Sequence, residues 1–492
     1  MIHLILIGLF LFLSCFASPV MSQVKPKGVS SKNTLQNTTQ TERKHIGTQT
    51  DASKTNASKA KSIQDQTQSN STPAVPVSRA SKKEDDSPWR IAPFPLLNYN
   101  SGTGLGYGAF LSFFKKSSQA HQKGARHDFA LNLQYYSTTR SYSYHKLMLD
   151  APRLNQSGLR IQLMGGYESW DQAWFFGVDG SQGIQLDLMN TQYYQYQIHN
   201  FWMLPSIIQP IQAIHPAFAM FFSACLRWAS VHVYPNSLLS QQQVVGKDGG
   251  DIIQLSLGLM WDSRDRDPDT RDGLWTEFSG RYSDRLWGSE YEMWGFNITH
   301  RQWIPMNQTQ SVIWAYRLGI DYQGGHIPFF QRAIMGGSQW VELGGNSSMR
   351  GYRRGRLLGD LSIYYSQEVR WTMGEFHIKK RPIAYQLTPI IDVGYITYFS
   401  PHPLDVPSNQ MTDSPSSTSF PTSTMSNRSA SSADLDFFDQ LYTSFGLGAR
   451  FIYDESFILR LDFAMALERI TEGQRIRRQL LPAFFAIVNH TF

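Results

Sequence analysis

The sequence predicts an all-β protein: a sixteen-stranded antiparallel transmembrane β-barrel behind a disordered N-terminal tail. Three observations carry this prediction. Segments of about ten residues alternate between apolar and polar side chains, their ends are often aromatic, and 13% of all residues are aromatic. A soluble β-sandwich also alternates, but it rarely needs so many strands with aromatic ends. A closed barrel pairs every backbone group that lipid would leave unpaired.

The first 22 residues are an apolar run followed by small residues, which is typical of a secretory signal peptide cleaved after Ser22. Beyond this stretch no window of about 20 apolar residues occurs, which argues against helical membrane spans. Cleavage leaves Cys225 alone, so an internal disulfide is excluded. Whether Cys15 is lipidated stays open.

Residues 23–88 contain no Phe, Trp or Tyr and are rich in Ser, Thr, Gln, Asn and Lys. Such a segment buries too little apolar area to offset the entropy of ordering, so we expect a disordered periplasmic tail. It holds 11 Lys and Arg against 6 Asp and Glu, a net charge of +5 out of +6 for the chain. The basic charge therefore belongs to the tail, which favours weak contact with anionic surfaces over nucleic-acid binding.

Residues 89–492 carry the barrel pattern. In 457–467, apolar side chains such as Phe463 share one face, whereas Arg460 and Asp462 share the other. Sixteen such segments are predicted to begin near residues 90, 104, 127, 141, 158, 191, 217, 251, 273, 290, 311, 361, 383, 440, 456 and 482. An even number of strands is typical of bacterial outer-membrane barrels.

The lengths of the connections predict the orientation of the barrel. If the tail is periplasmic, connections from odd to even strands face outward, and the long ones all fall there: 170–190, 229–250, 324–360 and 399–439. Connections from even to odd strands are mostly shorter, with 204–216 as an exception. Long outer loops and short periplasmic turns are expected of such barrels.

The chain ends in a strand whose outward face carries Phe484, Ala486, Val488 and Phe492. A terminal aromatic residue on such a strand resembles the recognition signal of bacterial outer-membrane proteins. We therefore expect Phe492 to act as the outer-membrane targeting signal, although His490 departs from the apolar pattern.

A Gly-rich and Arg-rich loop precedes the twelfth segment and contains Arg350. An arginine in a barrel lumen needs carboxylate partners, because an unpaired buried charge is costly, and its planar fork binds two acceptors at once. Glu368 and Asp392 lie on the inward faces of the next two segments. We therefore predict that loop 324–360 folds back into the lumen and that Arg350 binds both carboxylates.

Further residues fit this lumen latch. Gly351 allows the tight turn that a loop tip needs, and Arg370 and Gly394 share the inward faces. The alternative is a solvated surface loop that contacts lipid head groups. Arg353, Arg354 and Arg356 fit that alternative.

These motifs resemble the bacterial surface antigen superfamily of sixteen-stranded barrels, which includes BamA, TamA and two-partner-secretion transporters such as FhaC. In that family an Arg-Gly-Phe/Tyr motif caps the sixth outer loop, and its arginine meets acidic residues of the next two strands. Arg350, Gly351 and Tyr352 match the motif, Glu368 matches the acidic residue of the twelfth strand, and Asp392 and Gly394 match an Asp-x-Gly motif. Segments 261–273 and 93–110 resemble further family segments, so the resemblance covers about 89–492.

Assembly members of that family carry POTRA modules before the barrel, and residues 23–88 cannot form their compact core. The resemblance therefore implies a barrel-only member. Some relatives carry a phospholipase, but this sequence has no G-x-S-x-G motif, and its 13 histidines show no metal-binding spacing. We expect no enzyme, no cofactor and no metal site.

The resemblance implies a bacterial outer-membrane protein that inserts or translocates proteins, or remodels the membrane. Its first and last strands, 91–98 and 482–492, would separate at a weak seam. A passive solute pore, or a structural barrel with a separate POTRA-bearing periplasmic partner, are the alternatives. The expected partners are outer-membrane lipid and unfolded outer-membrane proteins. The client, the opening of the seam and the oligomeric state stay open.

Overall fold

The computed structural model describes residues 88–488, apart from residues 101, 117–123, 126, 156, 179–182, 268, 379–380, 399–439, 454–456 and 474. The predicted signal peptide 1–22, nearly all of the predicted tail 23–88, the connection 399–439 and Phe492 therefore lie outside the described residues.

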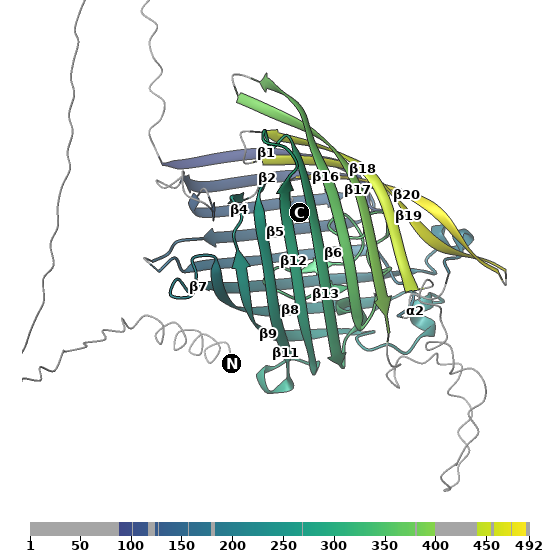
Figure 1. The fold of residues 1–492 in the computed structure, drawn as a ribbon. Helices are drawn as coiled ribbons and strands as arrows, with labels where there is room; N and C mark the ends of the chain where they lie inside the picture. The colour runs from purple at the N-terminus through teal and green to yellow at the C-terminus, as the bar shows by residue number, and fades with distance from the viewer. Residues whose placement is uncertain are drawn as a thin grey trace, which may run out of the picture. The chain divides into compact units, whose positions relative to one another are not determined.

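Sixteen long strands form one antiparallel sheet in which each strand pairs with its neighbours in the chain (Figure 1). They are β1 (Trp89–Asn100), β2 (Gly104–Lys116), β4 (His127–Thr138), β5 (Tyr142–Ala151), β6 (Arg160–Trp174), β7 (Gln195–Pro210), β8 (Phe218–Val233), β9 (Gly249–Asp262), β11 (Gly273–Ser283), β12 (Met293–Pro305), β13 (Val312–Gly325), β16 (Leu361–Ile378), β17 (Arg381–Thr397), β18 (Leu441–Tyr453), β19 (Phe457–Glu472) and β20 (Arg475–Val488). The predicted fold class and strand number are confirmed. The largest error is β20, which begins at Arg475 rather than near 482.

Shorter elements lie in the connections. They are β3 (Gly124–Ala125), β10 (Arg266–Asp267), β14 (Ile334–Met335), β15 (Val341–Glu342), α2 (Leu238–Gln241) and the 3₁₀ helices η1 (Leu186–Asn190), η2 (Arg285–Trp287) and η3 (Phe329–Gln331). In the part of the chain that the structure describes, no helix has the length and apolar character needed to cross a membrane.

The two faces of the sheet differ in chemistry, as the alternation predicts. On β19, Phe463 is 47% exposed, whereas its neighbours Asp462 and Ala464 are fully buried. On β9, Leu257 is exposed between the buried residues Ser256 and Gly258. Because successive side chains of a strand point to opposite faces, one face of the wall presents large apolar side chains and the other lines a filled lumen.

The two ends of the barrel differ in the lengths of their connections. At one end, here called the short-turn end, every connection between the long strands has at most ten residues. The other end, the long-loop end, carries 175–194, 234–248 and 326–360. The predicted exception at 204–216 was wrong: β7 continues to Pro210, which leaves a turn of only 211–217. The strand accommodates Pro205 because the β7–β8 register skips Leu204 and Pro205.

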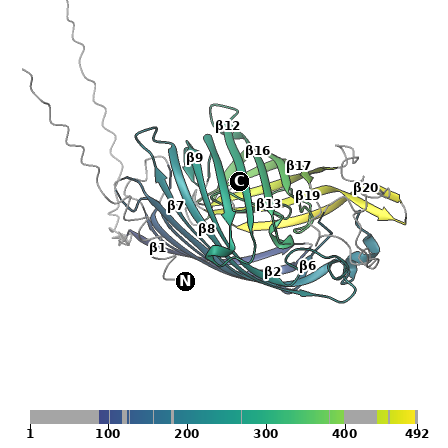
Figure 2. The ribbon, with the colours of Figure 1, turned by 90° about the horizontal axis from the view of Figure 1, so that it is seen from below.

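The hydrogen-bonded order of the strands begins with β1 and ends with β20. The sheet curls so that these two end strands are neighbours, and Figure 2 shows the purple first strands running beside the yellow last ones. This place in the wall is called the seam below.

The outward face gives a test of membrane placement. Leu257→Arg puts a charge on the lipid-facing side of β9, so we expect the free energy of unfolding in lipid vesicles to fall by about 2–4 kcal/mol. Leu286→Arg is the matched control, because Leu286 is exposed in a connection outside the strands. Urea titration of the folded barrel measures both variants. Equal stability of the two would contradict the lipid contact of β9.

Candidate functional site

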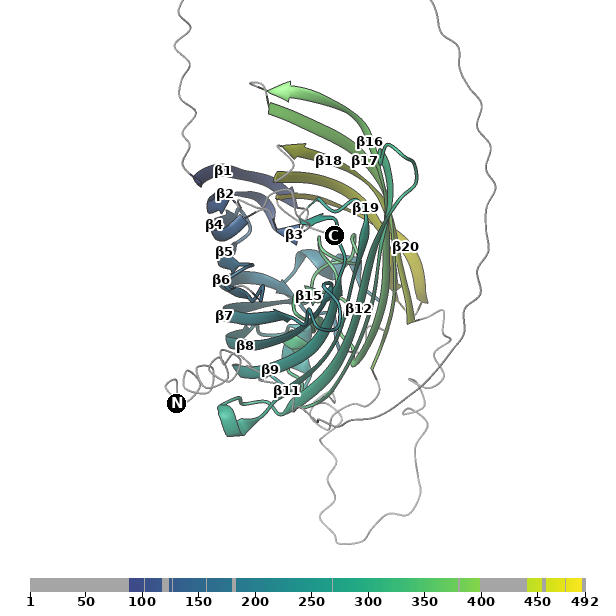
Figure 3. The same ribbon diagram turned by 60° about the vertical axis from the view of Figure 1, so that its left-hand side comes forward.

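The connection between β13 and β16 lies inside the ring of strands; Figure 3 shows β15, which belongs to it, on the inner side of the sheet. Its own apolar residues, such as Leu343 and Met349, are completely buried. They pack with Tyr364 of β16 and Tyr442 of β18. This connection, residues 326–360, is called the arginine loop below.

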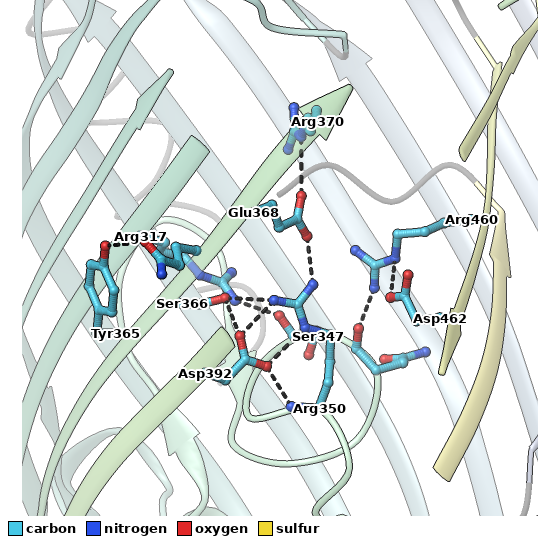
Figure 4. A network of polar contacts seen from close by, with 12 residues as sticks. Arg317, Ser347, Arg350, Tyr365, Ser366, Glu368, Arg370, Asp392, Arg460 and Asp462 are labelled. Atoms are coloured by element: carbon cyan, nitrogen blue, oxygen red, sulfur yellow. Dashed lines mark hydrogen bonds and ion pairs between the residues drawn. The ribbon is translucent and has the colours of Figure 1, made fainter. Parts of the chain in front are cut away.

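Arg350 lies at the centre of a polar network between the loop and the wall (Figure 4). Its Nε and Nη2 atoms donate to the two carboxylate oxygens of Asp392 at 2.9 and 2.6 Å, and its backbone amide donates to Asp392 Oδ2 at 2.8 Å. Its Nη1 donates to Glu368 Oε1 at 2.6 Å, and its Nη2 donates to Ser366 at 2.9 Å. All four side chains are buried.

The register of the sheet places these acceptors together. Ser366 of β16 lies directly opposite Asp392 of β17 and donates a hydrogen bond to it at 2.6 Å. Glu368 is two residues further along β16 and therefore shares the inward face with Ser366. Burial lowers the pKa of the Arg350 guanidinium, but Asp392 and Glu368 outweigh this effect and hold the pKa above its ordinary value. Arg350 is therefore charged at any physiological pH.

Glu368 is shared by three guanidinium groups. Besides Arg350, it accepts hydrogen bonds from Arg370 at 3.1 Å and from Arg450 of β18. A buried carboxylate among three arginines is stabilised by several charge-assisted hydrogen bonds. Arg370 also donates to the backbone carbonyl of Thr270 at 3.5 Å, which ties this network to the connection between β9 and β11.

Two glycines make room for the loop tip. Gly351 has a φ of +100°, and a Cβ atom there would lie 2.9 Å from the backbone nitrogen of Ala466 on β19. A Cβ on Gly394 of β17 would meet the end of the Met349 side chain at 2.9 Å. The first glycine supplies a left-handed backbone conformation, and the second leaves space for the residue that precedes Arg350.

The Tyr352 hydroxyl replaces one backbone pair between β18 and β19. The β18–β19 ladder ends at Ser444 and Ala466, so Thr443 and Leu467 would form the next pair. The Tyr352 hydroxyl instead accepts from the Thr443 amide at 2.9 Å and lies 3.0 Å from the carbonyl oxygens of both Thr443 and Leu467. One side chain of the loop therefore satisfies backbone groups of two strands.

The same edge of β19 is occupied further along by connection 175–194. The Ile184 amide donates to the Arg469 carbonyl at 2.7 Å, and the Thr471 amide donates to the Ile184 carbonyl at 2.9 Å. This isolated parallel bridge extends the pairing of β19 beyond the point where β18 diverges from it. Among the described residues, two inward connections thus supply partners to backbone groups of the wall at the long-loop end.

Two arginines that fit a solvated surface loop are in fact ion-paired in the lumen. Arg354 binds Glu168 of β6 at 2.8 Å, and Arg356 binds Glu468 of β19 at 3.0 Å. Arg353 lies 4.6 Å over the ring of Trp174. The surface-loop interpretation was wrong for these residues. The alternation of apolar and polar residues can predict that their carboxylate partners face inward. It cannot predict which arginine binds which carboxylate, because the two positions lie far apart in the sequence.

A third connection, 263–272, enters the lumen from the short-turn end. Within 263–272, β10 pairs in parallel with β3. Asp262 binds Arg264 at 2.8 Å, and Asp265 accepts from Arg266 at 3.0 Å, so ion pairs hold this turn together. This turn therefore contacts β3, between β2 and β4, and also Arg370 of β16 on another part of the wall.

The arginine loop leaves two cavities beside it, of about 490 and 650 Å³. Glu342 and Arg354 of the loop line both cavities. Across the described ranges, no group of three or more His, Cys, Asp or Glu side chains is placed to hold a metal ion. The chemistry of the lumen is that of ion pairs and aromatic contacts.

Residues 99–480 match the Omp85 superfamily domain, and the chain therefore belongs to the Omp85 superfamily. This confirms the family that the motifs indicated, and it makes the protein an outer-membrane barrel of the bacterial cell. The superfamily consists of transport and assembly barrels that typically engage membrane and client proteins and are generally not enzymes. A comparison with curated protein sequences gives no match.

Several solved structures are similar to the chain. A structure of BamA from Haemophilus ducreyi lacking POTRA domains 1–3 has a TM-score of 0.49 and 13% identity, and covers 82% of this chain and 70% of its own. CdiB from Escherichia coli has a TM-score of 0.45 and 10% identity, over 82% of this chain and 63% of its own. CdiB from Acinetobacter baumannii has a TM-score of 0.41 and 13% identity, over 81% and 59%.

The hydroxyl of Tyr352 can be tested by its removal. Tyr352→Phe leaves the ring in place but deprives the Thr443 amide and the Leu467 carbonyl of their partner, so we expect a loss of about 1–3 kcal/mol in the free energy of unfolding. Tyr364→Phe is the matched control, because the buried Tyr364 hydroxyl has no hydrogen-bond partner among the described residues. If urea unfolding gave the same stability for both variants, the hydroxyl would not hold the two strands.

Proposed function

We propose that this barrel assists the insertion or translocation of proteins, or the remodelling of the outer membrane, without enzymatic catalysis. The arginine loop, predicted as 324–360, is held in the lumen by a latch. The residues of this latch are Arg350, Gly351, Tyr352, Glu368, Arg370, Asp392 and Gly394. The observation that carries the proposal is the buried contact of Arg350 with Asp392 and Glu368 on two neighbouring strands.

The filled lumen favours this function over that of a passive solute pore. A pore needs a water-filled passage, whereas here a loop with its own apolar core and ion pairs to β6, β16, β17 and β19 occupies the interior. The route offered to a client or to lipid is then the wall itself, at the seam between 91–98 and 482–492. The membership in a family of assembly and transport barrels supports the same reading.

The rest of the chain has defined tasks in this proposal. Residues 1–22 direct export and are removed, residues 23–88 form a periplasmic tail, and Phe492 marks the barrel for assembly into the outer membrane. A separate POTRA-bearing protein supplies the periplasmic binding modules if the barrel does not act alone. That partner is the second candidate, and the assay below separates it from the first.

Arg350→Ala is expected to abolish the activity while the barrel still forms. Removal of one partner from a buried ion pair costs about 3–5 kcal/mol and leaves Asp392 uncompensated, so the loop loses its fixed position. The measurement is the folding rate of an unfolded outer-membrane protein, diluted from urea into liposomes that contain the mature barrel. Wild type should accelerate folding, and the variant should not.

Arg285→Ala is the matched control, because Arg285 forms an exposed ion pair with Glu292 outside the strands. It should accelerate folding as the wild type does. Full activity of Arg350→Ala, with the loop still protected from protease, would refute the latch. No acceleration by the wild type would exclude an insertase that acts alone, and co-purification of a POTRA-bearing protein or ion conductance would then decide between the partner and the pore.

A further inference from the structure

Two prolines within the wall show which of its two neighbouring ladders an outward-facing proline interrupts. Pro389 of β17 faces outward, and the β16–β17 register skips Thr388 and Pro389, whereas the β17–β18 register runs through them. Pro205 of β7 interrupts the register with β8 but not with β6. Proline lacks the amide hydrogen of a ladder bond, so the skipped side is the side towards which its nitrogen points.

The two cases differ in direction because β7 and β17 run antiparallel to each other. A residue directs both its N–H and its C=O to one neighbouring strand, and the next residue directs them to the other. In a strand that runs like β17, the N–H and C=O groups of an outward residue therefore point towards the preceding strand. In a strand that runs like β7, the N–H and C=O groups of an outward residue point towards the following strand.

This rule applies directly to the end strands. The first strand, β1, runs in the direction of β17, and its outward residues include Pro93 and Pro95. The last strand, β20, runs in the direction of β7, and its outward residues include Pro482. In the closed wall, the strand that precedes β1 is β20, and the strand that follows β20 is β1. The amide hydrogens that Pro93, Pro95 and Pro482 lack would therefore all have pointed into the seam.

The registers on the other sides of these strands agree with this placement. The β1–β2 ladder is continuous from Trp89 to Asn100, and the β19–β20 ladder is continuous through Pro482. Neither ladder skips a proline, unlike those at Pro205 and Pro389. The prolines of the end strands therefore leave the interior ladders intact and remove hydrogen-bond donors from the seam alone.

We propose that Pro93, Pro95 and Pro482 keep the seam from closing by a continuous backbone ladder, so that the wall of this barrel opens there. The inference rests on the proposed function, in which the route lies at the seam, and it names the residues that set the weakness. The seam-facing carbonyls lack partners in the open state as well, so each missing donor removes one hydrogen bond that closure would otherwise gain and lowers the stability of the closed state relative to the open one. Proline in an edge strand is a known way to prevent pairing.

The space behind the seam fits an opening at this place. The cavity of about 490 Å³ is lined by Leu96 of β1, by Ala483 and Phe485 of β20, and by Tyr352 and Arg353 of the arginine loop. An opened seam would therefore join the outer face of the barrel to a cavity that the loop bounds. A lipid chain or a client segment that entered the wall would meet the loop tip first.

The test compares the separation of β1 and β20 with and without the prolines. Spin labels are placed at Leu97→Cys and Leu480→Cys, two outward positions, in a mature barrel with Cys225→Ser, and distances are measured by pulsed electron resonance in lipid vesicles. We expect the parent barrel to show a population with long separations. Pro93→Ala/Pro95→Ala/Pro482→Ala should lose that population, because the restored amides complete the ladder.

Pro205→Ala/Pro389→Ala is the matched control, since it restores donors inside the wall and should leave the label distances unchanged. A triple variant that keeps the long separations would overturn the proposal, as would a parent barrel with one short separation. Heat-modifiable migration in gels identifies folded samples, and Pro482→Ala alone serves if the triple variant does not fold. The folding rate of a client protein, measured on the same samples, separates the role of the prolines from the role of the seam as the route. If the triple variant lost the long separations but still accelerated client folding, the role of the prolines would be supported and the seam would be refuted as the route.

Discussion

Every backbone N–H and C=O group inside a membrane needs a partner, and this constraint governs the wall of the barrel. Most of the sixteen strands meet it by pairing with both neighbours. Where β18 and β19 diverge, the Tyr352 hydroxyl and the backbone of Ile184 supply the missing partners. The inward connections are therefore part of the wall as well as contents of the lumen, and a change in their position changes the pairing of β19.

Three arginines of the arginine loop each bind a carboxylate on a different strand. Arg350 binds Asp392 of β17, Arg354 binds Glu168 of β6, and Arg356 binds Glu468 of β19. A buried charge that loses its partner is costly, so withdrawal of one arginine at a time is unfavourable. We therefore expect the loop to leave the lumen or stay in it as a unit.

The strands and the inward position of Asp392 could be predicted from local sequence, because the period-2 alternation fixes which side chains share a face. The start of β20 was misplaced because its first residues include Arg475 and Arg477, which carry no apolar alternation. Contacts across the lumen were not predictable. Glu168, the partner of Arg354 in the wall, lies 186 residues away in the chain, and its identity depends on how the whole sheet curls. The skipped pairs at Pro205 and Pro389 likewise appear only once the registers are known.

The arginine loop and the seam are mechanically connected through β19. The loop tip contacts β19 through Tyr352 and Arg356, and β19 pairs with β20, whose other edge faces the seam. On the far side of the seam the loop binds Glu168 of β6 through Arg354, and the same guanidinium donates to the Tyr142 hydroxyl of β5 at 3.1 Å. The loop therefore spans the two parts of the wall that the seam joins. If three prolines weaken the direct backbone link, these side-chain contacts carry more of the closure, and release of the latch and opening of the seam become steps of one process.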